Sequence, residues 1–360
     1  MKDYNIIGID LAKRKFHILA LDSQGKTALK KKLKRDEVLP YIEKTFLKGS
    51  RIAMEACGGC HHWGRSLKEL GYEVILLKPK DVKPFAKSRQ KNDMNDALGI
   101  CKAANDPQLK HVHLKSKKEQ EIAGLHKTRK QIIKRRIQLS NSIEACLLEW
   151  DYLVNVSKNT FLAETSSIIK DAYNKSKIID ITYEQLLFDA EELKLLLDRE
   201  KQINQKIKLL NKESEKAQKL LDIPGVGELI ANILSVQPME SYEDARDYAA
   251  SLGLVPSQHT SADKIKLGGI SKQGNRYIRT MLIQGARTII MRASRLNPPK
   301  HDIYDFAVKI RARKGFNLSS VAVANKIARI AYACVVKNTE YVKNKKEQQK
   351  CLIGQASLQH

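Results

Sequence analysis

Short apolar runs of strand length alternate with helical periodicity along the first 110 or so residues. The runs stand at residues 4–10, 15–22, 51–55 and 73–77, and a turn at 23–25 leads from the second run into a further strand. Helical patterns lie between them, at about 37–47 and 63–70. Strands that alternate with helices predict an α/β domain, which we assign to residues 1–112.

From about residue 115 the pattern changes to two long helices that are rich in Lys, Arg, Glu and Gln. In the first helix Arg129 and Arg136 share a stripe of three- and four-residue spacings with Ile122, Leu125, Ile132, Leu139, Ile143, Cys146 and Trp150. The second helix repeats this spacing, interrupted by Glu200, at Leu193, Leu196, Ile203, Ile207 and Leu210. The stripes predict a helical arm over residues 113–218 with a coiled-coil seam, either within the chain or between subunits.

The arm ends at a turn in which Pro224, Gly225 and Gly227 mark a boundary. Beyond it, short helical patterns alternate with Gly-rich turns, including residues 267–275. We therefore expect a second compact domain, mostly helical, over residues 219–342. A charged tail, 343–360, follows it.

The charge balance indicates a polyanionic partner. The 360 residues include 65 Lys and Arg against 40 Asp and Glu, a formal net charge of +25 that is spread along the chain. A hydrophobic content of 42% is enough for packed cores and excludes wholesale disorder. There is no membrane-length apolar run or signal peptide, and six scattered cysteines do not make a secreted disulfide framework. We therefore expect a cytoplasmic protein with no membrane partner.

Four carboxylates in the first domain stand where a metal site is expected. Asp10 and Glu55 each end a predicted strand, while Asp93 and Asp96 share one face at the start of a predicted helix. Carboxylates in such an arrangement suit two Mg²⁺ ions that clamp a scissile phosphate. Each acid alone also has a structural interpretation, as a helix cap, a first-turn acid or a turn former. The set of four in so basic a chain favours catalysis.

Two other cofactor motifs in the first domain are incomplete. Residues 8–10 before a hairpin are typical of actin-like ATPases, but no second phosphate loop, Gly-rich adenosine loop or Walker A motif follows. Residues 57–61 (Cys-Gly-Gly-Cys-His) match a haem-attachment string, and with His62 they suggest zinc. Haem attachment needs export, and zinc needs ligands that no second Cys/His cluster supplies. We interpret this segment as a Gly-rich turn that lets a nucleic-acid backbone approach Glu55.

Two loops of the C-terminal domain are suited to phosphate. Residues 221–231, with Gly225 and Gly227, are typical of a helix-hairpin-helix turn that binds phosphate through backbone N–H groups, and an ordinary helix–helix turn has the same pattern. The second loop places small hydroxyl residues among the cations Lys264, Lys272, Arg276 and Arg279. Its serines either bind phosphate passively, which composition favours, or supply a nucleophile.

Six motifs occur in order over residues 5–340. They are Gly-Ile-Asp-Leu-Ala-Lys (8–13), Met-Glu-Ala-Cys-Gly (54–58), Lys-Asn-Asp-Met-Asn-Asp-Ala (91–97), Ile-Pro-Gly-Val-Gly (223–227), Gly-Leu-Val-Pro (253–256) and Gly-Gly-Ile-Ser-Lys-Gln-Gly-Asn (268–275). Together they resemble the DEDD transposases of the one-ten insertion-sequence family, which are described as bridge-RNA-guided recombinases.

The resemblance implies a RuvC-like first domain of the RNase H fold, with a Mg²⁺-binding tetrad of Asp10, Glu55, Asp93 and Asp96. It implies that the last domain is a transposase domain whose catalytic serine maps onto Ser261, five residues after Pro256. Members commonly have Ser-Gly there, whereas this chain has Ser261-Ala262. The neighbouring hydroxyl residues that leave the register open are Ser257, Thr260 and Ser271.

By the same resemblance, the serine attacks DNA to form a 5′-phosphoserine in a site shared with the RuvC-like domain of another subunit. The expected partners are DNA at the element ends and target, a guide RNA, and further copies of the chain in a dimer or tetramer joined through the arm. The expected location is the prokaryotic cytoplasm, at the nucleoid. Nucleic-acid backbones are expected to contact Lys127, Arg129, Lys130, Lys134, Arg135 and Arg136.

Two other functions stay open as alternatives. A RuvC-like endonuclease would hydrolyse junction DNA with water and leave free 5′-phosphates without a protein adduct. A non-catalytic RNA-binding protein would not depend on Asp10, and the cluster of acids argues against it.

Overall fold

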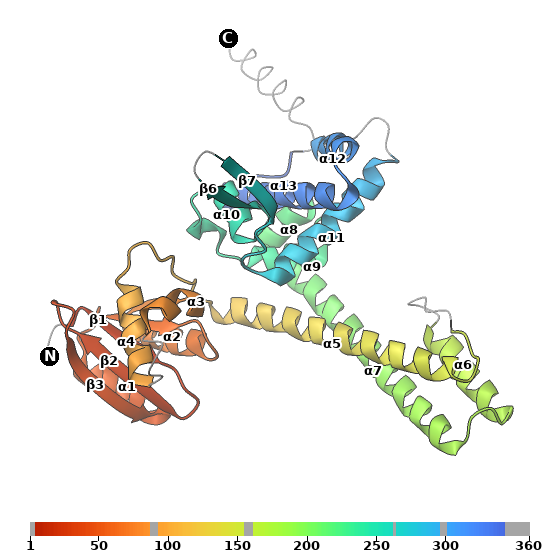
Figure 1. Cartoon of the computed structure of the whole chain (residues 1–360), viewed down its shortest axis with the longest axis horizontal. Helices are drawn as coiled ribbons and strands as arrows, with labels where there is room; N and C mark the ends of the chain where they lie inside the picture. Colours follow the sequence, from red (N-terminus) through yellow and green to blue (C-terminus); the bar gives the residue numbers. More distant parts are fainter. Residues whose placement is uncertain (1–3, 87–92, 155–160, 262–263, 296–300, 343–360) are drawn as a thin grey trace, which may run out of the picture. The chain divides into compact units, whose positions relative to one another are not determined.

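The chain forms two compact units in the computed structural model, which describes residues 4–86, 93–154, 161–261, 264–295 and 301–342. The first unit, Met1–Gln120, contains a five-stranded sheet, and the second, Glu121–His360, is mainly helical (Figure 1). The helical arm belongs to the same unit as the C-terminal helices. The finer boundaries at residues 112, 218 and 342 stay predictions.

The sheet of the first unit mixes antiparallel and parallel pairing. Its strands are β1 (Ile6–Asp10), β2 (Lys15–Leu21), β3 (Thr27–Lys34), β4 (Arg51–Glu55) and β5 (Glu73–Leu77). Their order is β3-β2-β1-β4-β5, in which β2 runs antiparallel to β1 and β3 while β1, β4 and β5 are parallel. Short turns join the antiparallel strands, and helices provide the crossovers that parallel strands need. The α/β prediction for this part of the chain is confirmed.

Helices cover both faces of this sheet. On one face α1 (Val38–Thr45) and α2 (Cys60–Glu69) enclose apolar strand residues, and on the other α4 (Asp93–Ala104) packs on β1 and β2. A Cβ added at Gly8 would lie 2.5 Å from the Ala97 carbonyl oxygen and 2.6 Å from Cys101 Sγ. Glycine thus lets α4 lie directly on β1, close to the end of that strand. A short helix, α3 (Pro79–Val82), follows β5.

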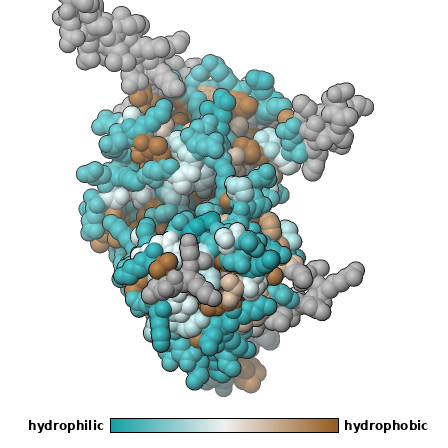
Figure 2. Space-filling model, turned by 90° about the vertical axis from the view of Figure 1, so that its left-hand side faces the viewer, coloured by the Kyte–Doolittle hydropathy of each residue, from teal (hydrophilic) through white to brown (hydrophobic). Residues whose placement is uncertain are grey.

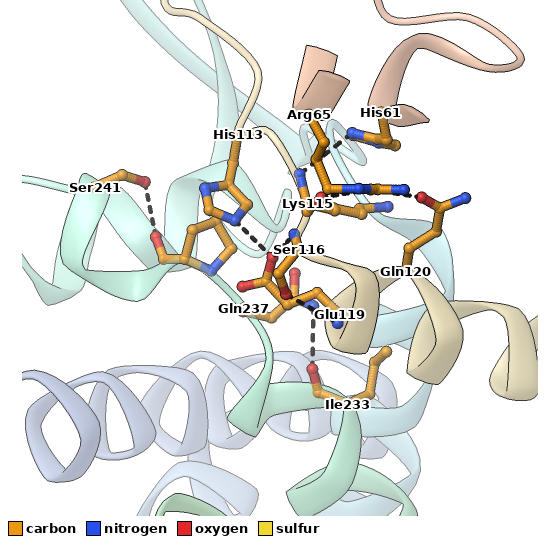
Figure 3. A network of polar contacts seen from close by, with 11 residues as sticks. His61, Arg65, His113, Lys115, Ser116, Glu119, Gln120, Ile233, Gln237 and Ser241 are labelled. Atoms are coloured by element: carbon orange, nitrogen blue, oxygen red, sulfur yellow. Dashed lines mark hydrogen bonds and ion pairs between the residues drawn. The ribbon is translucent and has the colours of Figure 1, made fainter. Parts of the chain in front are cut away.

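Polar contacts hold the start of α5 (Lys117–Leu148) to α2 (Figure 3). Arg65 Nη1 donates to the Lys115 carbonyl and to Gln120 Oε1, both at 2.8 Å. The Lys115 N–H donates to His61 Nδ1 at 3.3 Å. His61 thus accepts a structural hydrogen bond at the start of α2, and the turn that precedes the helix is formed by Gly58 and Gly59.

A capping box begins α5. Glu119 Oε2 accepts from the Ser116 N–H at 2.8 Å, and Ser116 Oγ accepts from the Glu119 N–H at 3.2 Å. This reciprocal pair satisfies two N–H groups that a helix start leaves without intrahelical partners. Glu119 also lies 2.9 Å from His113 Nε2, which further fixes the chain where it enters the arm.

The arm consists of α5, α6 (Phe161–Asn174) and α7 (Asp180–Lys212). Its outer part has an apolar core to which all three helices contribute, with Ile143, Ile169 and Leu193 fully or almost fully buried. The sequence did not predict α6, and Trp150 lies beyond the end of α5 with 41% of its surface exposed.

A polar seam joins α5 to α7 within the arm. Glu200 is 4% exposed, and its carboxylate lies 3.4 Å from Arg129 Nη2 and 3.3 Å from Arg136 Nε. Arg129 Nε also donates to Asn204 Oδ1 at 2.7 Å. At these positions the predicted stripe therefore lies between α5 and α7, where the Glu200 carboxylate of α7 pairs with two arginines of α5. Whether the seam continues as a coiled coil stays a prediction.

A buried chain of hydrogen bonds ties α5 to the body of the second unit. His126 lies 3.0 Å from both Tyr277 Oη and Asn232 Oδ1. Asn232 Nδ2 in turn donates to Asn211 Oδ1 at 2.9 Å. These residues come from α5, α7 and two helices of the body, so the network fixes how the base of the arm packs.

The body of the second unit is built from α8 (Glu215–Leu221), α9 (Glu228–Ser235), α10 (Ala245–Ser251), α11 (Arg276–Ala293), α12 (Asp302–Arg313) and α13 (Phe316–Val336). A hairpin of β6 (Pro256–Ser261) and β7 (Lys264–Ile270) accompanies them. The mostly helical prediction is confirmed, whereas the hairpin was not predicted. In the described part of the chain, α13 has the length and apolarity of a membrane span, but 56% of that window is buried and it packs on α10, α11 and α12.

The surface in Figure 2 is largely hydrophilic, with apolar residues in small separate patches. This agrees with the high content of charged residues, 29% of the chain.

Candidate catalytic site

Three of the four predicted metal-binding acids come together in the first unit. Asp10 ends β1 and Glu55 ends β4, and because these strands are parallel neighbours their carboxylates stand at the same edge of the sheet. Asp96, in the first turn of α4, lies within electrostatic range of Glu55. We call Asp10, Glu55 and Asp96 the carboxylate edge. Asp93 begins α4, but its side chain lies outside the described residues.

The charges of the carboxylate edge repel one another. Burial raises the pKa of Glu55, and the carboxylates of Asp10 and Asp96 raise that pKa further. Each of these causes disfavours the ionised form. A nearby cation would stabilise the charged form of such a group.

The donor set of the carboxylate edge fits a hard divalent cation. Carboxylate oxygens are the preferred protein ligands of such ions, and here they come from two strand ends and a facing helix. Among the side chains that the structure describes, no three His, Cys, Asp or Glu already form a closed metal cluster. Asp10, Glu55 and Asp96 are the described residues that would hold the ion.

His17 belongs to this region, although the sequence analysis did not single it out. It lies opposite Asp10 in the β1–β2 register, is 4% exposed, and has Nδ1 4.0 Å from Asp10 Oδ2. A predicted β1–β2 hairpin indicates that some residue of 15–22 faces Asp10. Which one it is depends on the register, which the sequence pattern left open.

The hairpin β6–β7 carries the predicted nucleophile. Ser261 is the last residue of β6 and pairs with Lys264 at the start of β7, and the side chains of both lie outside the described residues. Ser257 sits nearer the base of the hairpin, where its Oγ donates to the Gly269 carbonyl at 3.1 Å. Ser257 is therefore hydrogen-bonded within the hairpin, and Ser261 is the last residue of its first strand.

The base of this hairpin depends on close backbone packing. Gly274 has φ +69°, and a Cβ there would lie 1.8 Å from the Ser251 carbonyl oxygen. Arg279 is 7% exposed, and its Nη1 donates to the carbonyls of Leu252 at 2.9 Å and Gln273 at 2.7 Å. Arg279 thus holds the two loop segments together from inside. Its predicted contact with nucleic acid stays a prediction.

The turn between α8 and α9 also has a packing role. Gly225 has φ +82°, and its added Cβ would lie 2.7 Å from Ile289 Cδ1 and 2.9 Å from the Gly285 carbonyl oxygen. The turn therefore lies directly on α11. Gly227, the N-cap of α9, has no atom near its Cβ position. The phosphate-binding interpretation of this turn stays a prediction.

The basic residues of the arm divide into paired and exposed ones. Arg129 and Arg136 are engaged with Glu200, and Arg135 pairs at the surface with Glu192 at 2.7 Å. The exposed cations that were predicted to contact nucleic acid are, on the arm, Lys127, Lys130 and Lys134 and, near the hairpin, Lys272 and Arg276.

Comparisons with known proteins agree with this organisation. Residues 7–150 match the DEDD transposase domain of the IS110 family, and residues 217–304 match the transposases of the IS116/IS110/IS902 family. The transposase for insertion sequence element IS1111A of Coxiella burnetii is 32% identical over 348 residues, which covers 95% of this chain and 92% of the relative. The transposase for IS1328 of Yersinia enterocolitica is 30% identical over 345 residues, 95% of this chain and 100% of the relative.

A probable family 20 transposase of Pseudomonas aeruginosa is 32% identical over 341 residues, 93% of this chain and 98% of the relative. The first family match contains Asp10, Glu55 and Asp96, and the second contains the hairpin with Ser261. The matches to these relatives cover 93–95% of the chain, so the similarity extends over both units. The chain belongs to the IS110 family of DEDD transposases, enzymes that catalyse DNA strand cleavage and transfer.

Proposed function

We propose that this transposase cuts and exchanges DNA strands with a metal site in an RNase H-like, RuvC-like first domain and a serine nucleophile in the last domain. The metal ligands are Asp10, Glu55, Asp93 and Asp96, and the metal is Mg²⁺. The observation that carries the proposal is the carboxylate edge, where burial and two neighbouring carboxylates raise the pKa of Glu55. The antiparallel meander that continues into parallel strands, with α4 over β1, supports the fold assignment.

The acids of the carboxylate edge have a binding and orienting role in this proposal. When bound, a pair of Mg²⁺ ions would neutralise charge on the scissile phosphate. Asp10 and Glu55 stand on neighbouring strands rather than on loops, which fixes the distance between their carboxylates. The close packing of α4 at Gly8 keeps Asp96 facing them.

Ser261 is the proposed nucleophile. Its Oγ attacks the phosphorus and loses its proton to solvent, a P–Oγ bond forms, and the bond to the deoxyribose 3′-oxygen breaks. The 3′-oxygen leaves and takes up a proton. The resulting 5′-phosphoserine retains a phosphodiester, so a second 3′-hydroxyl can attack it and reseal the strand without ATP. The internal hydrogen bond of Ser257 supports Ser261 in this role.

A guide RNA and further copies of the chain complete the proposal. The exposed Lys127, Lys130 and Lys134 on the arm are suited to nucleic-acid backbones. Arg276 and Lys272 are exposed beside the serine hairpin, where DNA would be held. The net charge of +25 gives ample capacity for both RNA and DNA.

The test is a search for a covalent protein–DNA adduct on the element's own ends in the presence of Mg²⁺. Wild-type protein should form an adduct that survives denaturation and releases a phosphoserine peptide after proteolysis. Ser261→Ala should abolish the adduct while leaving DNA binding unchanged. Ser257→Ala is the matched control and should retain it.

Two outcomes would overturn parts of the proposal. An adduct that persists in Ser261→Ala and disappears in Ser257→Ala or Ser271→Ala would reassign the nucleophile. Free 5′-phosphate products without any adduct would instead show hydrolysis by water, as in a RuvC-like junction endonuclease.

A further inference from the structure

A line of lysines on β3 shares a sheet face with the carboxylate edge. Strand pairing sets Asp10 opposite His17 and His17 opposite Lys32, so these residues form one row across β1, β2 and β3. Residues two apart on a strand point to the same face, so Lys30 and Lys34 lie on that face with Lys32. All three are exposed, and β3 is an edge strand (Figure 1). We call Lys30, Lys32 and Lys34 the lysine row.

The residues between them lie on the opposite face and have other roles. Leu33 is 7% exposed and belongs to the core beneath α1 and α2, and Leu29 packs against the same core. Lys31 Nζ lies 6.0 Å from the centroid of the Tyr41 ring on α1. Lys31 thus carries the same charge on the same strand but faces away from the carboxylate edge.

The lysine row is not paired with acids among the described residues. Within the described part of the chain, no carboxylate forms an ion pair with its members. Lys34 lies opposite Lys15 in the β2–β3 register, and like charges at opposite positions destabilise a sheet. Lysines on an edge strand discourage association with other strands. Protection of the edge strand does not explain why these lysines share a sheet face with the candidate metal ligands.

The spacing of the row suits an extended polyanion. A strand rises about 3.3 Å per residue, so alternate side chains stand about 6.6 Å apart. Cations at regular intervals along a line can follow the phosphates of a nucleic-acid strand, whereas a compact acidic ligand would need cations that converge. Because Lys32 lies in the row of Asp10, the line passes beside the carboxylate edge.

We propose that the lysine row binds the phosphate backbone of the DNA strand that is processed at the carboxylate edge, on one side of the scissile phosphate. This proposal rests on the proposed function, because it takes the carboxylate edge as the cleavage centre. DNA is the partner because the row adjoins the residues that would cut it. The strand would lie along β3, on the part of this face that α4, which packs on β1 and β2, leaves uncovered.

The test compares two triple variants of the full chain that lose the same charge. Lys30→Gln, Lys32→Gln and Lys34→Gln together remove the row, and Lys31→Gln, Lys44→Gln and Lys48→Gln together remove three exposed lysines at or near α1. Affinity is measured by fluorescence anisotropy against a labelled single-stranded DNA of an element end, over a series of salt concentrations. A single-stranded RNA of the same sequence and length is the second probe.

Loss of three phosphate contacts should lower the salt slope for single-stranded DNA by about 2 and weaken binding about 100-fold at 0.1 M salt. The control triple should change affinity several-fold at most. Equal losses in the two triples would overturn the proposal, because only total charge would then matter. A loss confined to the RNA probe would overturn it as well and assign the row to RNA.

A catalytic variant separates this proposal from the proposed function. Glu55→Gln should bind the DNA probe as tightly as wild type and fail to cleave element-end DNA. If Glu55→Gln still cleaves, the metal-site assignment fails while the binding comparison of the two triples stands. If Glu55→Gln is inactive and the row triple cleaves and binds like the control triple, the lysine row alone is refuted.

Discussion

The carboxylate edge of the first unit and the Glu200 seam of the second show two ways of placing carboxylates inside a protein. Glu200 is 4% exposed, and two arginines whose side chains are only 12% and 18% exposed pair with it. Glu55 is less buried, but its neighbours are Asp10 and Asp96, which raise its pKa. A buried acid paired with arginines fixes structure, whereas acids that repel one another are stabilised in their charged form when a cation binds.

This difference makes opposite predictions for the same chemical change. Replacing a carboxylate by the isosteric amide removes repulsion at the carboxylate edge, while in the seam it removes the charge that two arginines require. The change should therefore reduce activity but not stability at the carboxylate edge, and it should reduce stability at the Glu200 seam.

The largest expected effect is on activity at the carboxylate edge. If the proposed metal site is right, Glu55→Gln should lower the rate of Mg²⁺-dependent cleavage by at least about 1,000-fold, since it removes a proposed ligand of the ion that would stabilise the transition state. The same change should leave the unfolding temperature in metal-free buffer unchanged or raised, because it removes repulsion. Cleavage assays and thermal unfolding measure the two effects. A variant that loses activity by unfolding would contradict this interpretation.

The seam should show the reverse. Glu200→Gln leaves Arg129 and Arg136 without their counter-charge in a largely buried position, and should lower the free energy of unfolding by about 3 kcal/mol. Urea denaturation of the full chain measures this change. The control is Glu192→Gln, which breaks the exposed pair with Arg135 and should cost less than about 1 kcal/mol. Equal costs at the two positions would show that the seam is not a buried charge network.

The sequence predicted these two environments to different degrees. The helical stripes placed Arg129 and Arg136 on the seam of one helix and Glu200 in the seam of the other, because packed helices keep a three- and four-residue spacing. They left open whether the seam is within the chain or between subunits. Strand ends likewise brought Asp10 and Glu55 together, because parallel neighbours share their carboxyl edge. These features follow from local periodicity and strand order.

Other features depended on contacts that local periodicity does not encode. The place of His17 opposite Asp10 required the β1–β2 register, and the lysine row required the β2–β3 register as well. The β6–β7 hairpin has a Gly-rich second strand and forms a two-stranded sheet of its own. Arg279 was predicted as one of the cations beside the serine loop, yet its partners are backbone carbonyls, which every residue carries. Hydrogen bonds to backbone carbonyls cannot be predicted from the residue types of the partners.

Arg279 and Arg276 extend the comparison to the serine hairpin. Arg279→Met should lower the free energy of unfolding by about 2 kcal/mol, because two carbonyls in a buried loop base lose their donor. Arg276→Met, at an exposed position one turn away, should change stability by less than about 0.5 kcal/mol. It should instead weaken DNA binding. Chemical denaturation and anisotropy together separate the two roles, and equal destabilisation by both changes would refute the internal role of Arg279.

The smallest expected effect comes from His126, a buried titratable group that is compensated by hydrogen bonds rather than by charge. Because Asn232 Nδ2 donates to Asn211, Asn232 Oδ1 accepts from His126 Nε2, and His126 Nδ1 accepts from Tyr277. A ring that donates from Nε2 and accepts at Nδ1 is the neutral form of histidine. Burial lowers the pKa of His126, Arg129 lowers it further, and the hydrogen bond to Asn232 opposes both.

The direction of the pH effect follows from that shift. Below the ordinary pKa of 6.5 the unfolded chain takes up a proton at this position and the folded chain does not, until the pH reaches the lowered folded value. Stability should therefore fall as the pH drops from about 6.5, with a slope of at most about 1.4 kcal/mol per pH unit. His126→Gln should reduce this slope, whereas His62→Gln, at an exposed position, should preserve it. Urea midpoints between pH 5 and pH 7 measure the slopes. If both variants retain the wild-type slope, the acid sensitivity arises elsewhere and the network at the base of the arm does not hold a neutral histidine.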